Sequence, residues 1–137
     1  MTTTLHAPSP NRTALQWTLG ALSAIPMTSA VGEILRGPRA VPGGSPDVAP
    51  TVDSALRYAS VFKFAAGLTI LRELGRIERS QATTFALSTV AVGGLVRMIS
   101  WKQRGRPHPM IVGAIGLETI GVPILLTWQR RLSAKAV

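Results

Sequence analysis

Apolar residues gather into four stretches of similar length along the chain. A bilayer core of about 30 Å is spanned by about 20 mainly apolar residues in a helix that rises about 1.5 Å per residue. Each stretch reaches that length, so the pattern predicts four transmembrane helices, at residues 13–35, 55–74, 81–101 and 110–129. The expected fold is therefore all-α, a four-helix transmembrane bundle.

The connections between the spans predict their order. The first, residues 36–54, holds four prolines and three glycines, and this composition disfavours a helix and predicts an extended surface loop. The later two, around residues 72–81 and 102–109, are short and basic. Short links make consecutive spans antiparallel neighbours. We expect up-down connectivity in one domain, residues 13–131, between polar tails at 1–12 and 132–137.

The first span has a second interpretation, as a secretory signal peptide. Arg12 precedes the apolar run, and Thr28 and Ala30 stand where a cleavage site would place small residues. The apolar run nevertheless continues beyond Ala30 through VGEIL, and the basic segment is a single arginine. These two features favour a retained span.

Charge and cysteine content narrow the class of protein. The net charge of +9 comes from basic residues scattered over span ends and short loops, without an aromatic-interleaved basic surface or a nucleic-acid motif. The pattern argues against nucleic acid and predicts the lipid bilayer and anionic lipid head groups as partners. The absence of cysteine excludes disulfides, thiolate metal sites and iron–sulfur clusters.

Basic residues also predict the orientation of the chain. The side that holds both termini and the second loop has seven, namely Arg12, Arg72, Arg76, Arg79, Arg130, Arg131 and Lys135. The other side has five, namely Arg36, Arg39, Lys102, Arg104 and Arg106. Because basic residues are enriched in cytoplasmic loops, seven against five predicts cytoplasmic termini.

Five charged residues fall inside the predicted spans: Glu33, Arg57, Lys63, Arg97 and Glu118. Antiparallel threading places all of them in the half of the bilayer nearer the first loop, with Lys63 and Glu118 about 12 Å deep. An unpaired charge near the midplane costs on the order of 2.5 to 3.5 kcal/mol, so these side chains should face the bundle interior and one another. Three cations against two carboxylates would leave one excess positive charge.

Within this set we expect Arg97 to contact Glu118, with Arg57 as the third member and Asp53 holding it one helical turn earlier. Gly93 stands four residues before Arg97, and Ala114 and Gly121 flank Glu118 at minus four and plus three. Small residues on the faces that carry the two charges would let the helices approach closely.

The charged cluster has a structural and a functional interpretation. A buried Arg–Glu pair can fix helix packing without any ligand, and we give this interpretation the greater weight. Alternatively, a polar cavity with excess positive charge could receive an anionic head group, a carboxylate or a quinone oxygen, with donors from Tyr58, Ser60 and Trp101. Neither histidine, His6 or His108, lies in a span, which excludes an intramembrane bis-histidine haem and argues against a metal site.

The order of several motifs resembles a known bacterial family. From residue 53 to residue 131 they are DSALRY, GRIERS, GGLVRMIS, GRPHP and LETIGVPILLTWQRR. This set is similar to domain of unknown function family 4345, whose members are small four-helix membrane proteins. The resemblance implies the bacterial inner membrane as location, and it assigns to the family pattern Arg57, Arg97, Glu118 and the loop motif of Gly105, Arg106 and Pro107. Lys63 departs from the pattern, where an aromatic or aliphatic residue is expected.

Two function classes follow. The first is a non-catalytic integral membrane protein, either an accessory subunit of a membrane protein partner or a binder of a lipid or small molecule. The second is a minimal transporter or membrane redox component. No catalytic residues and no cofactor are indicated by any motif. A transporter needs a polar path through both halves of the membrane, whereas the predicted charges lie in one half, so the sequence favours a one-sided pocket.

Overall fold

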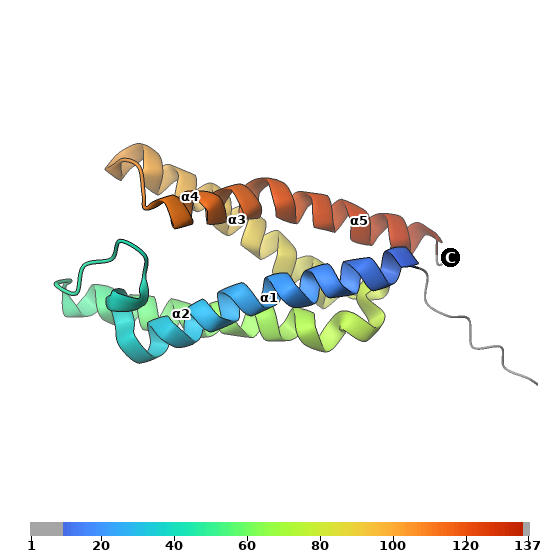
Figure 1. Cartoon of the computed structure of the whole chain (residues 1–137), viewed down its shortest axis with the longest axis horizontal. Coiled ribbons are helices and arrows are strands. Elements are labelled where there is room, and N and C mark those ends of the chain that lie inside the picture. Colours follow the sequence, from blue (N-terminus) through green and yellow to red (C-terminus); the bar gives the residue numbers. More distant parts are fainter. Residues whose placement is uncertain (1–9, 136–137) are drawn as a thin grey trace, which may run out of the picture.

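The computed structural model describes residues 10–135, and over this range the chain is helical and has no strand (Figure 1). Residues 1–9, with His6 and most of the predicted N-terminal tail, and residues 136–137 lie outside the described residues. Three long helices are α1 (Pro10–Arg36), α2 (Pro50–Glu73) and α3 (Gln81–Arg104). The fourth rod joins α4 (Pro109–Gly116), a π-helical turn η3 (Leu117–Gly121) and α5 (Val122–Lys135). The all-α prediction is confirmed for this part of the chain.

Local sequence explains where the helices begin and end. Pro50 and Pro109 stand in the first turns of α2 and α4, where a missing N–H costs nothing. Ser80 caps α3 because its hydroxyl accepts a hydrogen bond from the Thr83 N–H at 3.1 Å. Gly105, at φ 92°, ends α3 in a backbone conformation that suits glycine, and it begins the predicted loop motif with Arg106 and Pro107.

The first loop differs from the expected extended segment over residues 36–54. A short 3₁₀ helix, η1 (Gly37–Ala40), directly follows α1, and α2 already begins at Pro50, so residues 41–49 are the part without a helix. The prolines that argued against a helix are compatible with these ends, since proline fits the first turn of a helix. Where these prolines stand, rather than how many there are, therefore determines where the loop begins and ends.

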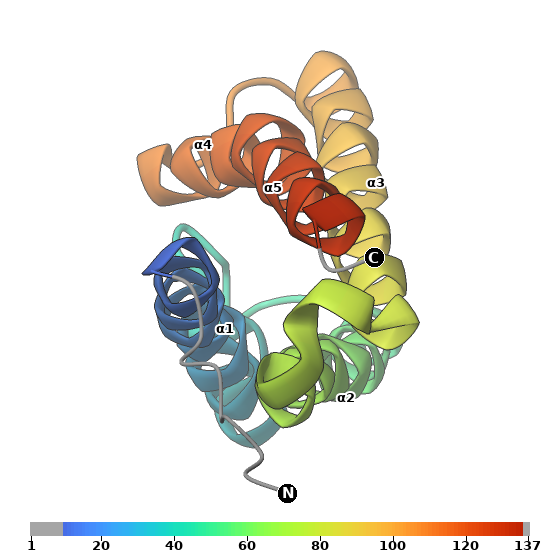
Figure 2. The ribbon, with the colours of Figure 1, turned by 90° about the vertical axis from the view of Figure 1, so that its right-hand side faces the viewer.

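The four rods stand around a common axis when seen from the end (Figure 2). α1 lies beside α2 with the most extensive contacts, and α3 lies beside the rod formed by α4 and α5 (Figures 1 and 2). The first loop meets the third, because a Cβ added at Gly43 would lie 3.2 Å from the Cβ of His108. The second connection, η2 (Leu74–Arg79), lies at the opposite end of the molecule.

The apolar core lies toward the end of the bundle that holds η2. Its buried members are Leu15, Leu19, Ile70, Ile77, Ala86, Leu87, Val122 and Leu125. They come from the first half of α1, the end of α2, η2, the first half of α3 and α5. In the half nearer the first loop, the buried side chains include Glu33 and Ser60 beside Ala30 and Ile115.

Length and composition fit a membrane span for three of the helices in the described range. These are the segments Pro10–Ala40, Gln81–Arg104 and Pro109–Ala134. α2 is also long, with 24 residues, but it does not reach the same hydropathy because Arg57 and Lys63 stand within it. Many large apolar side chains are exposed, among them Trp17 at 76% and Phe85 at 75%, which suits surfaces that face lipid.

Candidate functional site

Glu33 is the centre of a closed polar network between α1 and α2. Its side chain is buried, and the Lys63 Nζ donates to its Oε1 at 2.5 Å. The Ser60 hydroxyl donates to Oε2 at 2.6 Å, and the Ser29 hydroxyl donates to Oε1 at 2.9 Å. Both carboxylate oxygens are thus hydrogen-bonded, which is the condition under which a buried ion pair is tolerated. The sequence indicated Ser60 as a donor but missed Ser29.

Arg97 and Glu118 form the second pair, between α3 and the π-helical turn η3. The Arg97 Nε lies 3.4 Å from the Glu118 Oε2, so the contact expected from the sequence is present. That oxygen is shielded from solvent and has no hydrogen-bond partner among the described residues, so the pair is electrostatic only.

The close approach of the helices occurs at Gly94 and not at Gly93. A Cβ added at Gly93 would meet nothing within 4 Å, whereas one at Gly94 would lie 2.7 Å from the Cβ of Glu118 and 3.0 Å from the Cγ2 of Thr119. The expectation for Gly93 is therefore wrong by one residue. Positions three and four before a residue both share its helix face, and the crossing of the two rods decides which one makes the contact.

The π-helical turn that carries Glu118 was not expected from the sequence. The N–H of Val122 bonds to the carbonyl of Leu117, five residues earlier, in place of the ordinary spacing of four. Pro123 follows immediately and has no N–H to continue the ordinary ladder. We attribute the π turn to this proline, which gives a signal that sequence reasoning could have used.

Arg57 does not join the other charges as a third member. Its Nε donates to the Asp53 Oδ2 at 2.8 Å, as expected, and its NH1 donates to the Ile34 carbonyl at 2.5 Å. It therefore ties the start of α2 to the end of α1. Because Asp53 neutralises it, the expected excess positive charge of the buried cluster is absent. Tyr58 is 69% exposed and pairs edge to face with Phe62, outside the cluster.

A hollow of about 500 Å³ opens beside Arg57, between the end of α1, η1, the first loop and the start of α2. Its polar lining consists of Arg36, Arg39, Arg57 and Asp53, with Leu35, Pro38 and Pro46 as its apolar part. Three arginines and one aspartate thus line the hollow, and of these arginines Arg57 bonds to the aspartate. The sequence counted Arg36 and Arg39 only as loop charges, because the fold of η1 is needed to bring them together.

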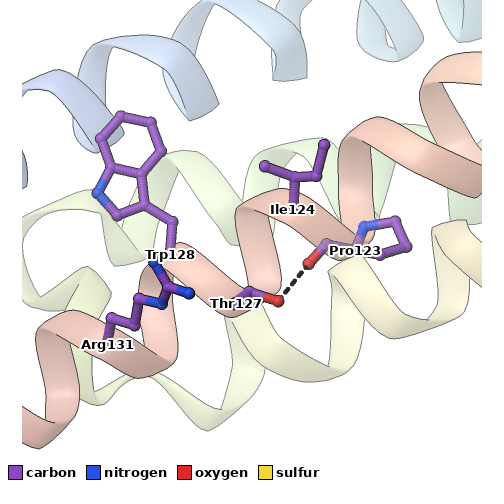
Figure 3. A pocket seen from close by; sticks show the side chains of 5 residues that line it. All are labelled: Pro123, Ile124, Thr127, Trp128 and Arg131. Atoms are coloured by element: carbon purple, nitrogen blue, oxygen red, sulfur yellow. Dashed lines mark hydrogen bonds between the residues drawn. The ribbon is translucent and has the colours of Figure 1, made fainter.

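A second hollow, of about 580 Å³, follows one face of α5 (Figure 3). Its lining is Pro123, Ile124, Thr127, Trp128 and Arg131, all from one helix. The Thr127 hydroxyl is already bonded to the Pro123 carbonyl at 2.9 Å, which leaves the guanidinium group of Arg131 and the indole N–H of Trp128 as the polar side-chain groups for a ligand (Figure 3). This groove offers an apolar wall to an acyl chain but few polar groups that could select a ligand.

At the opposite end of the bundle, Gln129 joins α5 to η2 and α3. Its Nε2 donates to the carbonyls of Ile77 at 2.8 Å and Ser80 at 3.1 Å, and its Oε1 accepts from the Thr84 hydroxyl at 3.1 Å. The sequence gave Gln129 no role. These bonds satisfy backbone groups at the end of a helix, so we interpret them as structural.

The described residues offer no metal centre. Within residues 10–135 no three His, Cys, Asp or Glu side chains come together as metal ligands would. His108 caps α4, since its Nδ1 accepts from the Met110 N–H at 3.3 Å. The site holds fixed charges and hydrogen-bonding groups between the helices in the half of the bundle nearer the first loop, an arrangement that can bind a polar or charged ligand.

Comparison with known protein families gives a match over most of the chain. A protein-family model described as "Domain of unknown function (DUF4345)" matches residues 14–129. This range covers most of the four helical rods, and it includes the ion pairs of Glu33, Arg57 and Arg97 and the hollow under the first loop. Neither the curated proteins nor the solved structures give a match.

Proposed function

The chain belongs to the family described as Domain of unknown function (DUF4345), and we propose that this member is a non-catalytic, multi-pass integral membrane protein that binds an anionic amphiphile. Its single domain, residues 13–131, would cross the inner membrane of a bacterial cell four times, with antiparallel up-down connectivity. Both termini would lie in the cytoplasm. The ligand would come from the leaflet on the side of the first loop.

The observation that carries the proposal is the separation of charge from the apolar core. Glu33, Lys63, Arg97 and Glu118 pair in the half of the bundle nearer the first loop, whereas the apolar core lies in the other half. Placing charged side chains in a bilayer costs free energy, so charges within the spans indicate a structural or functional role. In our proposal the two pairs fix the helices around a one-sided polar region, and the hollow lined by Arg36, Arg39 and Arg57 opens that region to the membrane surface.

The proposal requires α2 to span the bilayer despite its charges. Lys63 and Arg57 are both paired with carboxylates, so their charges are compensated within the bundle. α2 also exposes apolar side chains, Val61 at 54% and Phe62 at 59%, which suits contact with acyl chains. A helix with a paired polar face inward and an apolar face outward can cross a bilayer with a low mean hydropathy.

The binding part of the proposal is tested by mass spectrometry of the lipids that remain with the chain after purification in mild detergent. We expect anionic lipids to be enriched relative to the membrane from which the protein was extracted. Lipid composition equal to that of the membrane would refute the binding function.

The structural part is tested by charge exchange at the second pair. Arg97→Glu and Glu118→Arg alone should each lower the thermal stability in detergent, and the double variant should recover most of it while keeping the bound lipid. A double variant as unstable as either single one would show that the pair does not hold the helices.

A second candidate, a minimal transporter or membrane redox component, is favoured by one observation. Glu118 stands on a π turn, a feature frequent at functional sites, and one of its oxygens has no hydrogen bond among the described residues. Such a carboxylate could carry a proton. Proton flux into proteoliposomes that disappears in Glu118→Gln would support this candidate over simple binding.

A further inference from the structure

The hollow under the first loop has a composition that points to a particular ligand chemistry. It opens where α1 passes into η1, so its lining comes from two helix ends and a short loop. Its volume of about 500 Å³ falls within the range of about 300–1,000 Å³ that is usual for pockets holding small ligands. The polar residues are three arginines and one aspartate.

Two of these three arginines have no carboxylate partner within residues 10–135. Arg57 is occupied by Asp53 and by the Ile34 carbonyl, so it forms a fixed and neutralised floor. Within residues 10–135 neither Arg36 nor Arg39 takes part in an ion pair, and both side chains are exposed. The hollow is therefore lined by two arginines without a carboxylate partner, which are separated in the chain by Gly37 and Pro38.

Gly37 shows that this floor is closely fitted. It is buried, with φ 62°, and a Cβ there would collide with the Asp53 carboxylate and lie 2.7 Å from the Arg57 NH2. Glycine thus lets the backbone between Arg36 and Arg39 lie directly on the Asp53–Arg57 pair. The positions of the two free arginines are consequently set by a well-packed turn and not by a loose loop.

We propose that Arg36 and Arg39 bind the phosphate of an anionic phospholipid in this hollow. Guanidinium groups match the geometry of phosphate oxygens and bind them through charge-assisted hydrogen bonds. Leu35, which also lines the hollow, is 73% exposed and offers an apolar edge for the acyl chains. The inference rests on the proposed function, because it names the ligand class and the residues of the same one-sided site.

The test is native mass spectrometry of the purified full chain titrated with a short-chain phosphatidylglycerol, with phosphatidylcholine and with inorganic phosphate. We expect phosphatidylglycerol to bind best. Each basic residue near a membrane surface strengthens binding several-fold, so the double variant Arg36→Gln, Arg39→Gln should bind it about tenfold to thirtyfold more weakly. Arg39→Gln alone, in the exposed 3₁₀ turn, should cause at least about a third of the loss in binding free energy that the double variant causes.

The matched control removes the same charge at the same end of the bundle, in the double variant Arg104→Gln, Arg106→Gln. It should bind within about twofold of the wild type, because neither residue lines the hollow. Equal losses of affinity in both double variants would show that general surface charge, and not a defined site, binds the lipid. That result would overturn the inference. If millimolar inorganic phosphate displaces phosphatidylglycerol from the protein, the ligand of this hollow is free phosphate and not a lipid.

The outcomes separate this inference from the proposed function. If the wild type shows no preference for any anionic amphiphile, the proposed function itself fails. If the wild type prefers phosphatidylglycerol and the Arg36, Arg39 double variant keeps that affinity with unchanged circular dichroism and thermal stability, the function stands and the assignment of the site is wrong.

Discussion

Gly94 and Gly93 offer a sharp comparison, because the two neighbours on α3 differ in what surrounds them. Gly94→Ala would place a methyl group 2.7 Å from the Glu118 Cβ and 3.4 Å from its backbone carbonyl carbon, so the two rods must move apart. Gly93→Ala would place it in open space. Both changes raise helix propensity by the same amount, about 1 kcal/mol. The difference between the variants therefore reports the contact alone.

The expected magnitude follows from the cost of overpacking a close contact, about 1 to 3 kcal/mol. Gly93→Ala should leave the stability unchanged or raise it by up to about 1 kcal/mol, and Gly94→Ala should lie about 1 to 3 kcal/mol below it. Unfolding in mixed detergent micelles, followed by far-ultraviolet circular dichroism and tryptophan fluorescence, measures both. If Gly94→Ala is as stable as Gly93→Ala, the rods do not meet at Gly94, and the position of Glu118 against α3 is refuted.

Three further predictions concern the ion pair, the first loop and the orientation. Lys63→Met leaves the buried Glu33 carboxylate without its cation and should cost about 3 to 5 kcal/mol in the same unfolding assay, while adding Glu33→Gln should restore a large part; no recovery would contradict the pairing. Gly37→Ala forces a left-handed backbone and a collision with the floor of the hollow, so it should destabilise the protein by about 1 to 3 kcal/mol, and a neutral result would refute the tight turn. In this cysteine-free chain, Ser45→Cys should react with a membrane-impermeant maleimide in intact cells and Ala134→Cys only after permeabilisation; the reverse pattern would invert the proposed orientation.

The sequence alone was enough to identify the helices and the family. The four stretches predicted helices because, in lipid, each backbone N–H and C=O group would have to be satisfied within its own segment, and three of them are apolar enough for a membrane span. The sequence predicted that Arg97 contacts Glu118, because an unpaired charge inside such a bundle costs too much free energy. Asp53 and Arg57 stand four residues apart on one helix, so their pairing also follows from local geometry.

What the tertiary structure decided is how the five charges divide. Glu33 pairs with Lys63, Arg97 pairs with Glu118, and Arg57 pairs with Asp53 on its own helix. The predicted cluster therefore separates into three ion pairs. Sequence spacing gives the depth of a residue but not the rotation of one helix against another. A rotation of one residue, about 100°, moves a contact from Gly93 to Gly94. For the same reason, the hollow that Arg36 and Arg39 line beside the Asp53–Arg57 pair depends on the turn at Gly37, which only the packed chain defines.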